Sequence, residues 1–389
     1  MAVRKSVTTL SASERQAFVS ALKALKAAPS RCNPPTAGRY DDYVYVHMQA
    51  MLTLQLIDPS KPVRNGNWTG ANTMRMPMWA HRCPAFLPWH RELLHQFERD
   101  LQAVSNNSSL GLPYWDWTTA QSTTDVPWST DFLGGDGGDG PVTTGPFAGK
   151  QNWELTLSED QVDHLVRGFG RDTQNGPRLP TPAELDAAIA IAAYDQSPWS
   201  DQPDEATFRN RLEGWSVPPD SDLGVGLHNL VHLWVGGTQG TMLPSTSPND
   251  PAFFLHHCNI DRQWTVWQRR NPNVAFYAPP QMLPNDPGQS LDEPMVFFDP
   301  SLTSTPPWSD QPPTPRAMIN HQALGYSYDD DAAVHDVTQG IAAAEALPVT
   351  PASQQTDALK ARTDLTVMHR NRFRTRLADL VDPDAPQFA

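Results

Sequence analysis

Cysteine is scarce in this 389-residue chain, which contains only Cys32, Cys83 and Cys258. An odd set of three widely separated cysteines does not form the disulfide framework on which small secreted domains depend. The fold must therefore rely on a hydrophobic core. The 39% of hydrophobic residues, with 13 Trp and 14 Phe, are enough to fill one.

Long hydrophobic runs and an excess of positive charge are lacking too. No apolar run approaches the roughly 18 residues of a membrane-spanning helix, and the first residues, MAVRKSVTTLSASERQAF, lack the apolar segment of a secretory signal. A net charge of −14 argues against nucleic acid or an anionic membrane as a partner. With 38 Pro, we expect a soluble, loop-rich protein without such partners. We place it in the cytoplasm unless a partner protein exports it.

Histidines are concentrated in two neighbouring segments of the second half of the chain. The stretch SPNDPAFFLHHCNIDRQW, residues 247–264, contains His256 and His257, and LHNLVHLW contains His228 and His232 four residues apart. Residues four apart on a helix lie on one face, so both imidazoles can reach one metal ion. A third histidine from a facing helix would complete a site suited to copper or zinc.

A second group of histidines lies in the first half. A helix predicted over residues 41–55 contains His47, for which by itself a core position is favoured over a role as a ligand. His81 precedes two prolines and is expected on a loop, whereas His90 opens a helix that runs to about residue 103. Together the three would complete a second set of ligands. His95 lies about 140° round the helix from His90 and is predicted not to be a ligand.

Three other features carry less specific signals. Cys83 follows His81 by two residues, and we predict a buried free thiol, with a metal ligand or a cross-link as the alternatives. The aromatic segment LPYWDWT, residues 112–118, is predicted to form a buried wall. Glu213 lies near the end of a helix-like stretch over residues 204–215. A glutamate at such a position is usually a solvated surface charge, and this is our default interpretation of Glu213.

These segments together resemble the tyrosinase family of copper-dependent polyphenol oxidases. The resemblance covers roughly residues 10 to 330 and also includes LEGW at 212–215 and the tyrosine motif LGYSYDD at 324–330. It implies a mainly α fold, in which a four-helix bundle with long loops and a few short strands houses two copper ions. The dicopper centre of that family binds dioxygen as peroxide.

The resemblance also assigns individual residues. It implies that six histidines bind copper, three at each ion: His47, His81 and His90 at the first, and His228, His232 and His257 at the second. His256 would point away from the metal, and Asp261 would be a structural partner in the motif. Ligating rings need an acceptor for their other nitrogen, and Asn249 and Asp250 are our candidates. Trp79 occupies the position of the cysteine that forms a thioether in some relatives, so we expect no such cross-link.

The implied reaction is the oxidation of small phenols by dioxygen. Monophenols would be hydroxylated in the ortho position and catechols oxidised to ortho-quinones. Glu213 and Asn229 match the pair that holds a proton-accepting water, so they are the candidate catalytic residues. An ortho-aminophenol or catechol oxidase with little monophenol activity, and a haemocyanin-like oxygen carrier, are the alternatives.

The end of the chain differs in composition from the rest. We predict a catalytic domain over residues 1–330 and a C-terminal extension over 331–389, in which the linker-like PVTPASQQTD precedes an Arg-rich amphipathic helix at about 357–381. An isolated amphipathic helix is marginal in water, so it should pack against something. A homo-oligomer interface and the copper-site entrance are the two destinations, and a copper-loading or export partner is left open.

Overall fold

The computed structural model describes residues 1–32, 35–52, 80–135, 138, 140–158, 162–170, 178–196, 206–216, 225–237, 239–279, 290–297, 313–331 and 334–349. Its helices are α1 (Ala12–Ala27), α2 (Arg39–Leu52), α3 (Phe86–Ser105), α4 (Pro182–Ile189), α5 (Phe208–Glu213), α6 (Leu227–Gly236), α7 (Ala252–Arg270), α8 (Pro315–Ile319) and α9 (Thr338–Glu345). Its strands are β1 (Ala2–Arg4), β2 (Gly140–Pro141), β3 (Val166–Arg167) and β4 (Tyr326–Tyr328). The predicted mainly α fold with a few short strands is confirmed.

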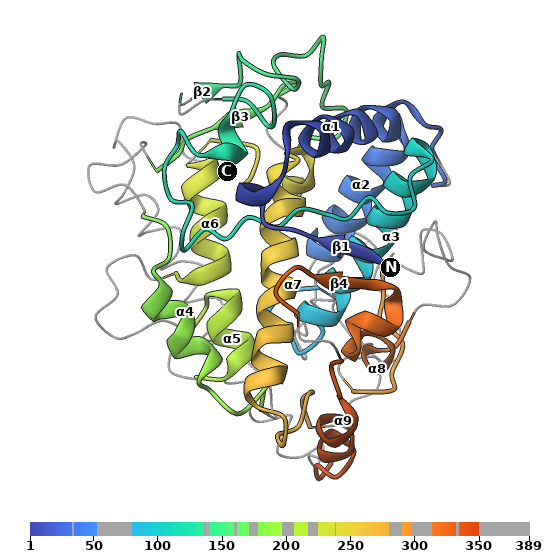
Figure 1. The fold of residues 1–389 in the computed structure, drawn as a ribbon, viewed down its shortest axis with the longest axis vertical. Helices are drawn as coiled ribbons and strands as arrows, with labels where there is room; N and C mark the ends of the chain where they lie inside the picture. The colour runs from blue at the N-terminus through green and yellow to red at the C-terminus, as the bar shows by residue number, and fades with distance from the viewer. Residues whose placement is uncertain are drawn as a thin grey trace, which may run out of the picture.

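Helix α7 runs through the middle of the molecule, with α6 on one side and α2 and α3 on the other (Figure 1). It is buried almost along its whole length, and its buried side chains include polar ones, such as His257, Asn259 and Asp261, as well as apolar ones. Its Phe254 ring stacks on Phe97 of α3 with centroids 3.5 Å apart. These four helices form the expected bundle. None of the helices in the described ranges is long and apolar enough to traverse a lipid bilayer.

Local sequence signals explain where the helices begin and end. The Ser11 side chain accepts from Glu14 N, and the Glu14 side chain accepts in return from Ser11 N, which forms a capping box for α1. Helix α5 ends at Gly214, whose φ is +98° and where a Cβ would lie 2.0 Å from Gly226 O. Only glycine fits this position, because both the left-handed backbone and the close approach exclude a side chain.

The two ends of the catalytic region are joined by a small parallel sheet. Strand β1 pairs with β4, with Ala2 opposite Tyr326 and Arg4 opposite Tyr328. The Arg4 guanidinium is buried and donates to both carboxylate oxygens of Glu98 on α3 at 3.1 Å. The N-terminal strand and the tyrosine motif are therefore fastened together against the bundle.

Residues 334–349 pack against the segment that follows α7. In α9, Gly340 O accepts from Phe276 N at 3.1 Å, and a Cβ on Gly340 would lie 2.3 Å from the Phe276 ring. The glycine thus allows α9 to lie directly on that ring. The helix predicted at 357–381 lies outside the described residues, as does Trp79, and the boundary at residue 330 stays a prediction.

Candidate metal centre

Two clusters of histidines lie among the described residues, and in each the candidate ligand nitrogens are all within 4.8 Å of one another. The first contains His47, His81 and His90, and the second contains His228, His232, His256 and His257. Every histidine that the sequence suggested as a ligand is in one of them, and His95 is in neither.

The first cluster draws on α2, α3 and the loop before α3. His47 Nδ1 donates to Ser245 O at 2.7 Å, and His90 Nδ1 donates to Phe86 O at 2.8 Å. In a neutral ring the proton on Nδ1 leaves Nε2 with a free lone pair. His81 comes from the loop, as predicted, and its Nε2 lies 3.3 Å from His47 Nε2.

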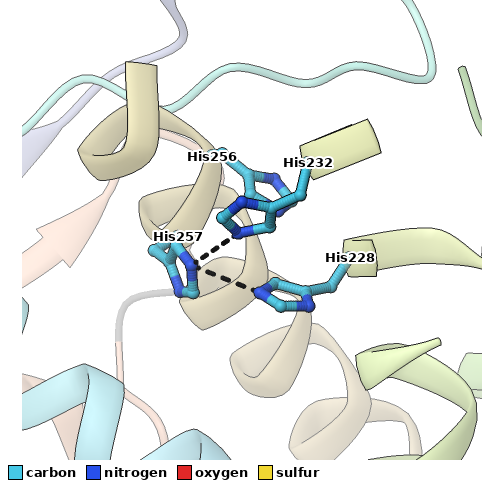
Figure 2. A group of neighbouring side chains, drawn as sticks. All are labelled: His228, His232, His256 and His257. Atoms are coloured by element: carbon cyan, nitrogen blue, oxygen red, sulfur yellow. Dashed lines mark hydrogen bonds between the residues drawn. The ribbon is translucent and has the colours of Figure 1, made fainter. Parts of the chain in front are cut away.

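The second cluster is formed by α6 and α7, and Figure 2 shows its rings converging. His232 Nδ1 donates to Met242 O at 2.6 Å, and His228 Nδ1 donates to the side-chain oxygen of Asn229 at 3.0 Å. The Nε2 atoms of His228 and His232 lie 3.3 and 3.2 Å from His257 Nε2. Three ring nitrogens therefore face one point between the helices.

This arrangement of nitrogens fits a metal ion. His228 and His232 both have a lone pair on Nε2 that can accept a hydrogen bond. His257 Nε2 carries at most one proton, so it cannot donate to both. A cation bound between the three nitrogens would interact with all of their lone pairs. A tetrahedral metal with nitrogen ligands at about 2.0–2.1 Å holds them about 3.3 Å apart, which matches the observed separations. Imidazole is a ligand that copper accepts well.

The protonation of the rings supports the same conclusion. Burial lowers the pKa of His47, His90, His228 and His257 well below the ordinary value, and neighbouring imidazoles lower it further. Burial likewise lowers the pKa of His232 to about 4. Neutral imidazole is the form that binds a metal ion, so these rings need no deprotonation at neutral pH.

His256 differs from its neighbour His257 in the hydrogen bond that it makes. Its Nδ1 lies 3.2 Å from Nε1 of the buried Trp117. The indole N–H can only donate, so His256 Nδ1 must accept, and a neutral ring then carries its proton on Nε2. That Nε2 has no lone pair for a metal ion, in keeping with the expectation that His257 rather than His256 is the ligand.

The acceptors that orient the rings are not those that we expected. Asp250 is occupied by Arg167, whose Nε donates to it at 2.8 Å, and Asn249 Nδ2 donates to Leu157 O at 2.5 Å. Three of the rings are instead held by backbone carbonyls, those of Ser245, Phe86 and Met242. Because every residue has such a carbonyl, no sequence signal could have identified them.

Glu213 lies beside the first cluster and is completely buried, so the default of a surface charge is wrong. Its Oε1 accepts from Arg82 N at 2.7 Å and lies 3.4 Å from His81 Nδ1, and its Oε2 accepts from Arg209 at 3.0 Å. Burial by itself raises the pKa of this carboxyl. The hydrogen bond with His81 and the charge of Arg209 outweigh burial, and the pKa is lowered. Arg209 was not predicted from the sequence, although it precedes Glu213 by four residues on α5.

Asn229, the second candidate catalytic residue, lies beside His228 of the second cluster. His228 Nδ1 lies 3.0 Å from the Asn229 side-chain oxygen and 3.2 Å from Glu213 O. A Cβ on Gly214 would lie 3.2 Å from Asn229 Cβ, which shows how closely the two segments pack. The structure thus brings the Asn229 side chain and the Glu213 backbone carbonyl to the same ring nitrogen of His228.

The less specific predictions have clear outcomes. Cys83 is buried and forms no disulfide among the described residues, as predicted. Trp115 and Trp117 of the aromatic segment are completely buried, so the segment does form a wall. Trp117 has a further role that we did not anticipate, because it donates to His256.

Comparison with known proteins assigns the family. The family model described as the common central domain of tyrosinase matches residues 37–270. The chain is 40% identical over 332 residues to a tyrosinase of Streptomyces antibioticus, an alignment that covers 85% of this chain and 100% of that protein. It is 36% identical over 350 residues to grixazone synthase of Streptomyces griseus, with coverage of 84% and 99%. Among solved structures, a polyphenol oxidase from Thermothelomyces thermophila aligns with a TM-score of 0.47 and 27% identity over 69% of this chain and 70% of that chain. The chain belongs to the tyrosinase family of type 3 copper oxidases.

Proposed function

We propose that this protein uses dioxygen to hydroxylate monophenols in the ortho position and to oxidise catechols to ortho-quinones. The observation that carries the proposal is the pair of histidine clusters, in each of which the candidate ligand nitrogens lie within 4.8 Å of one another. The tyrosinase family acts on phenols with dioxygen, and the chain shares 40% identity with one of its tyrosinases.

Each copper would have three imidazole ligands. The proposed ligands are His47, His81 and His90 for the first copper and His228, His232 and His257 for the second. The bound copper ions supply the electron-transfer chemistry that activates dioxygen. The chain holds the rings in the correct orientation through their Nδ1 hydrogen bonds.

Removal of the phenol proton is the step for which we propose a role for Glu213 and Asn229. A free phenol has a pKa near 10, so only about a thousandth of it is ionised at neutral pH. Glu213 is held ionised, and Asn229 Nδ2 is buried without a hydrogen-bond partner among the described residues. We propose that the two groups hold a water that accepts this proton.

An ortho-aminophenol or catechol oxidase with little monophenol activity is the second candidate. It would use the same six histidines and differ in the pocket that receives the substrate. The chain is 40% identical to a tyrosinase and 36% identical to grixazone synthase. Because these identities are so similar, they do not distinguish between the two enzymes, and we keep the second candidate.

Oxygen uptake by the copper-loaded protein tests both candidates. A monophenol, the corresponding catechol and an ortho-aminophenol are compared at equal concentration. Uptake with the monophenol supports the first candidate, and uptake with only the other two supports the second. If a catechol yields no quinone colour although oxygen binds reversibly, the protein is an oxygen carrier and both proposals fail.

A further inference from the structure

An ion pair between Arg91 and Asp261 joins the two helices that bring the histidine clusters together. Arg91 follows His90 on α3, and Asp261 lies about one turn after His257 on α7. The rings of His90 and His257, one from each cluster, are stacked with centroids 4.4 Å apart and an interplanar angle of 20°. The contact between α3 and α7 therefore brings one ring of each cluster together.

The Arg91 guanidinium contacts α7 in three ways. Its Nε donates to Asp261 Oδ1 at 2.5 Å, its Nη2 donates to Asp261 O at 3.4 Å, and its Cζ lies 4.0 Å from the ring centroid of Trp264. The remaining nitrogen, Nη1, donates to Met318 O at 2.7 Å and Ile319 O at 3.1 Å. One rigid side chain thus links α3 to α7 and to the end of α8.

The other carboxylate oxygen of Asp261 is fixed from the opposite side. Oδ2 accepts from Arg4 Nη1 at 3.1 Å, from the Tyr326 hydroxyl at 2.7 Å and from the Tyr328 hydroxyl at 2.5 Å. Arg91 is 0% and Asp261 3% exposed. Water therefore does not replace any of these contacts, and neither partner can move without leaving a buried charge unpaired.

Stability alone gives a weak reason for such a pair. The cost of removing two charges from water offsets most of their attraction, so apolar residues of similar size often stabilise a protein as well. A planar guanidinium with directional donors does fix both the distance and the angle between two helices. This matters at a reacting centre, where a displacement of about 1 Å can cost about 10²-fold in rate.

We propose that Arg91 and Asp261 are positioning residues that set the distance between the two coppers. The inference rests on the proposed dicopper function, and it assigns to this pair the geometry between the metals rather than the binding of either one. Substitution should therefore leave the copper content unchanged and alter the properties that depend on both ions together.

The test compares Arg91→Lys with Arg262→Lys on copper-loaded protein. Both variants shorten an arginine that forms an ion pair at α7, but Arg262 pairs with Asp330 and does not link α7 to α3. Both should retain two coppers per chain. Copper(II) ions about 3.5–4 Å apart can couple their spins, so we expect the copper visible by electron paramagnetic resonance to rise at least about twofold in Arg91→Lys alone. The near-ultraviolet band that develops with added hydrogen peroxide should weaken in parallel.

Two results would overturn the inference: unchanged spectra in Arg91→Lys, or equal changes in Arg262→Lys. If Arg91→Lys does not fold, Asp261→Asn replaces it under the same criteria, because it removes the charge and keeps the size of the side chain. A wild-type protein that does not bind two coppers would instead contradict the proposed function, so the two failures can be distinguished.

Discussion

At the scale of single residues, the position of one proton separates two adjacent histidines. Both rings of the pair on α7 are buried and lie in the same cluster, but Trp117 donates to His256 Nδ1, whereas His257 Nε2 faces the ring nitrogens of His228 and His232. Neighbours from other elements thus decide which ring can offer a lone pair to a metal ion.

Copper content tests this distinction. We expect His257→Ala to lose one copper per chain and essentially all oxidase activity, because the second site would keep two ligands. His256→Ala and His95→Ala are the matched controls and should retain two coppers by atomic absorption. The opposite pattern, with copper lost from His256→Ala and kept by His257→Ala, would reverse our assignment.

Glu213→Gln addresses the proposed removal of the phenol proton. General-base assistance is typically worth about 10² to 10⁴ in rate, so hydroxylation of a monophenol should fall by about this factor. Catechol oxidation should fall less, since a catechol is more acidic and binds through a second oxygen. The readout is kcat for each substrate, with the exposed Glu154→Gln as the control.

An equal loss of both activities would point to another role for Glu213. Its contacts with Arg82 N, His81 and Arg209 already suggest what this role would be, namely holding the loop that carries a copper ligand. Copper content then distinguishes the two cases, because a displaced loop lowers metal binding and the loss of a base does not.

At the scale of elements, the start of α1 depends on a single hydroxyl. Ser11 Oγ accepts from Glu14 N at 3.2 Å, and Glu14 Oε2 accepts from Ser11 N at 2.8 Å. Replacement of such a cap by alanine typically costs about 1 kcal/mol. We expect Ser11→Ala to lower the free energy of unfolding by about this amount in urea denaturation, whereas Ser20→Ala, on the exposed face of the same helix, should change it little.

The segment that leads into α9 should lose stability in acid. His335 is 7% exposed, and burial, followed by the nearby His321 and the cations Arg91 and Arg269, lowers its pKa to about 4. Between pH 6.5 and about 4 the unfolded chain therefore binds a proton that the folded chain does not. The free energy of unfolding should fall in this window by up to about 1.4 kcal/mol per pH unit and level off below it.

His335→Gln provides the comparison, because the amide does not titrate. Its thermal unfolding temperature should depend less steeply on pH between 6.5 and 4 than that of the wild-type protein. Equal slopes over this range would show that His335 is already protonated in the folded protein. His321, which donates to Asp331 at 2.7 Å, remains in the variant and contributes equally to both measurements.

At the scale of the whole molecule, the predicted amphipathic helix at 357–381 is expected to pack either in an interface between subunits or at the entrance of the copper site. A chain that ends at Val349 keeps α9, every histidine of both clusters and the contacts of Asp331 with Arg269 and His321. We expect this truncated chain to retain two coppers. The arginines of the predicted helix would be attracted to the acidic surface of the same chain or of a neighbouring subunit. If they contact a neighbouring subunit, the truncated chain should form a smaller oligomer in light scattering.

A rise in kcat at unchanged oligomer size would place this helix at the entrance of the copper site instead. No change in size or activity would contradict both interpretations. A chain that ends at Asp330 is a useful contrast, since it also removes Asp331 and α9 and should unfold at a lower temperature for that reason alone.

Local sequence patterns predicted the helices of the bundle, and together with the family resemblance they predicted the candidate ligands. The spacing of His228 and His232 places both rings on one helical face, and the prolines near His81 predict its loop, because these relations depend on residues close in the chain. The capping of α1 by Ser11 and the burial of the aromatic segment follow from equally local patterns.

Tertiary structure decided which atoms hold these rings and which protonation state they adopt. His47 is oriented by a carbonyl 198 residues away, Trp117 donates to His256 across 139 residues, and Arg91 meets Asp261 across 170 residues. A backbone carbonyl looks the same at every position in a sequence, and the pKa of an imidazole depends on burial by distant segments. The chemistry of the site therefore becomes defined only when the folded chain brings these segments together.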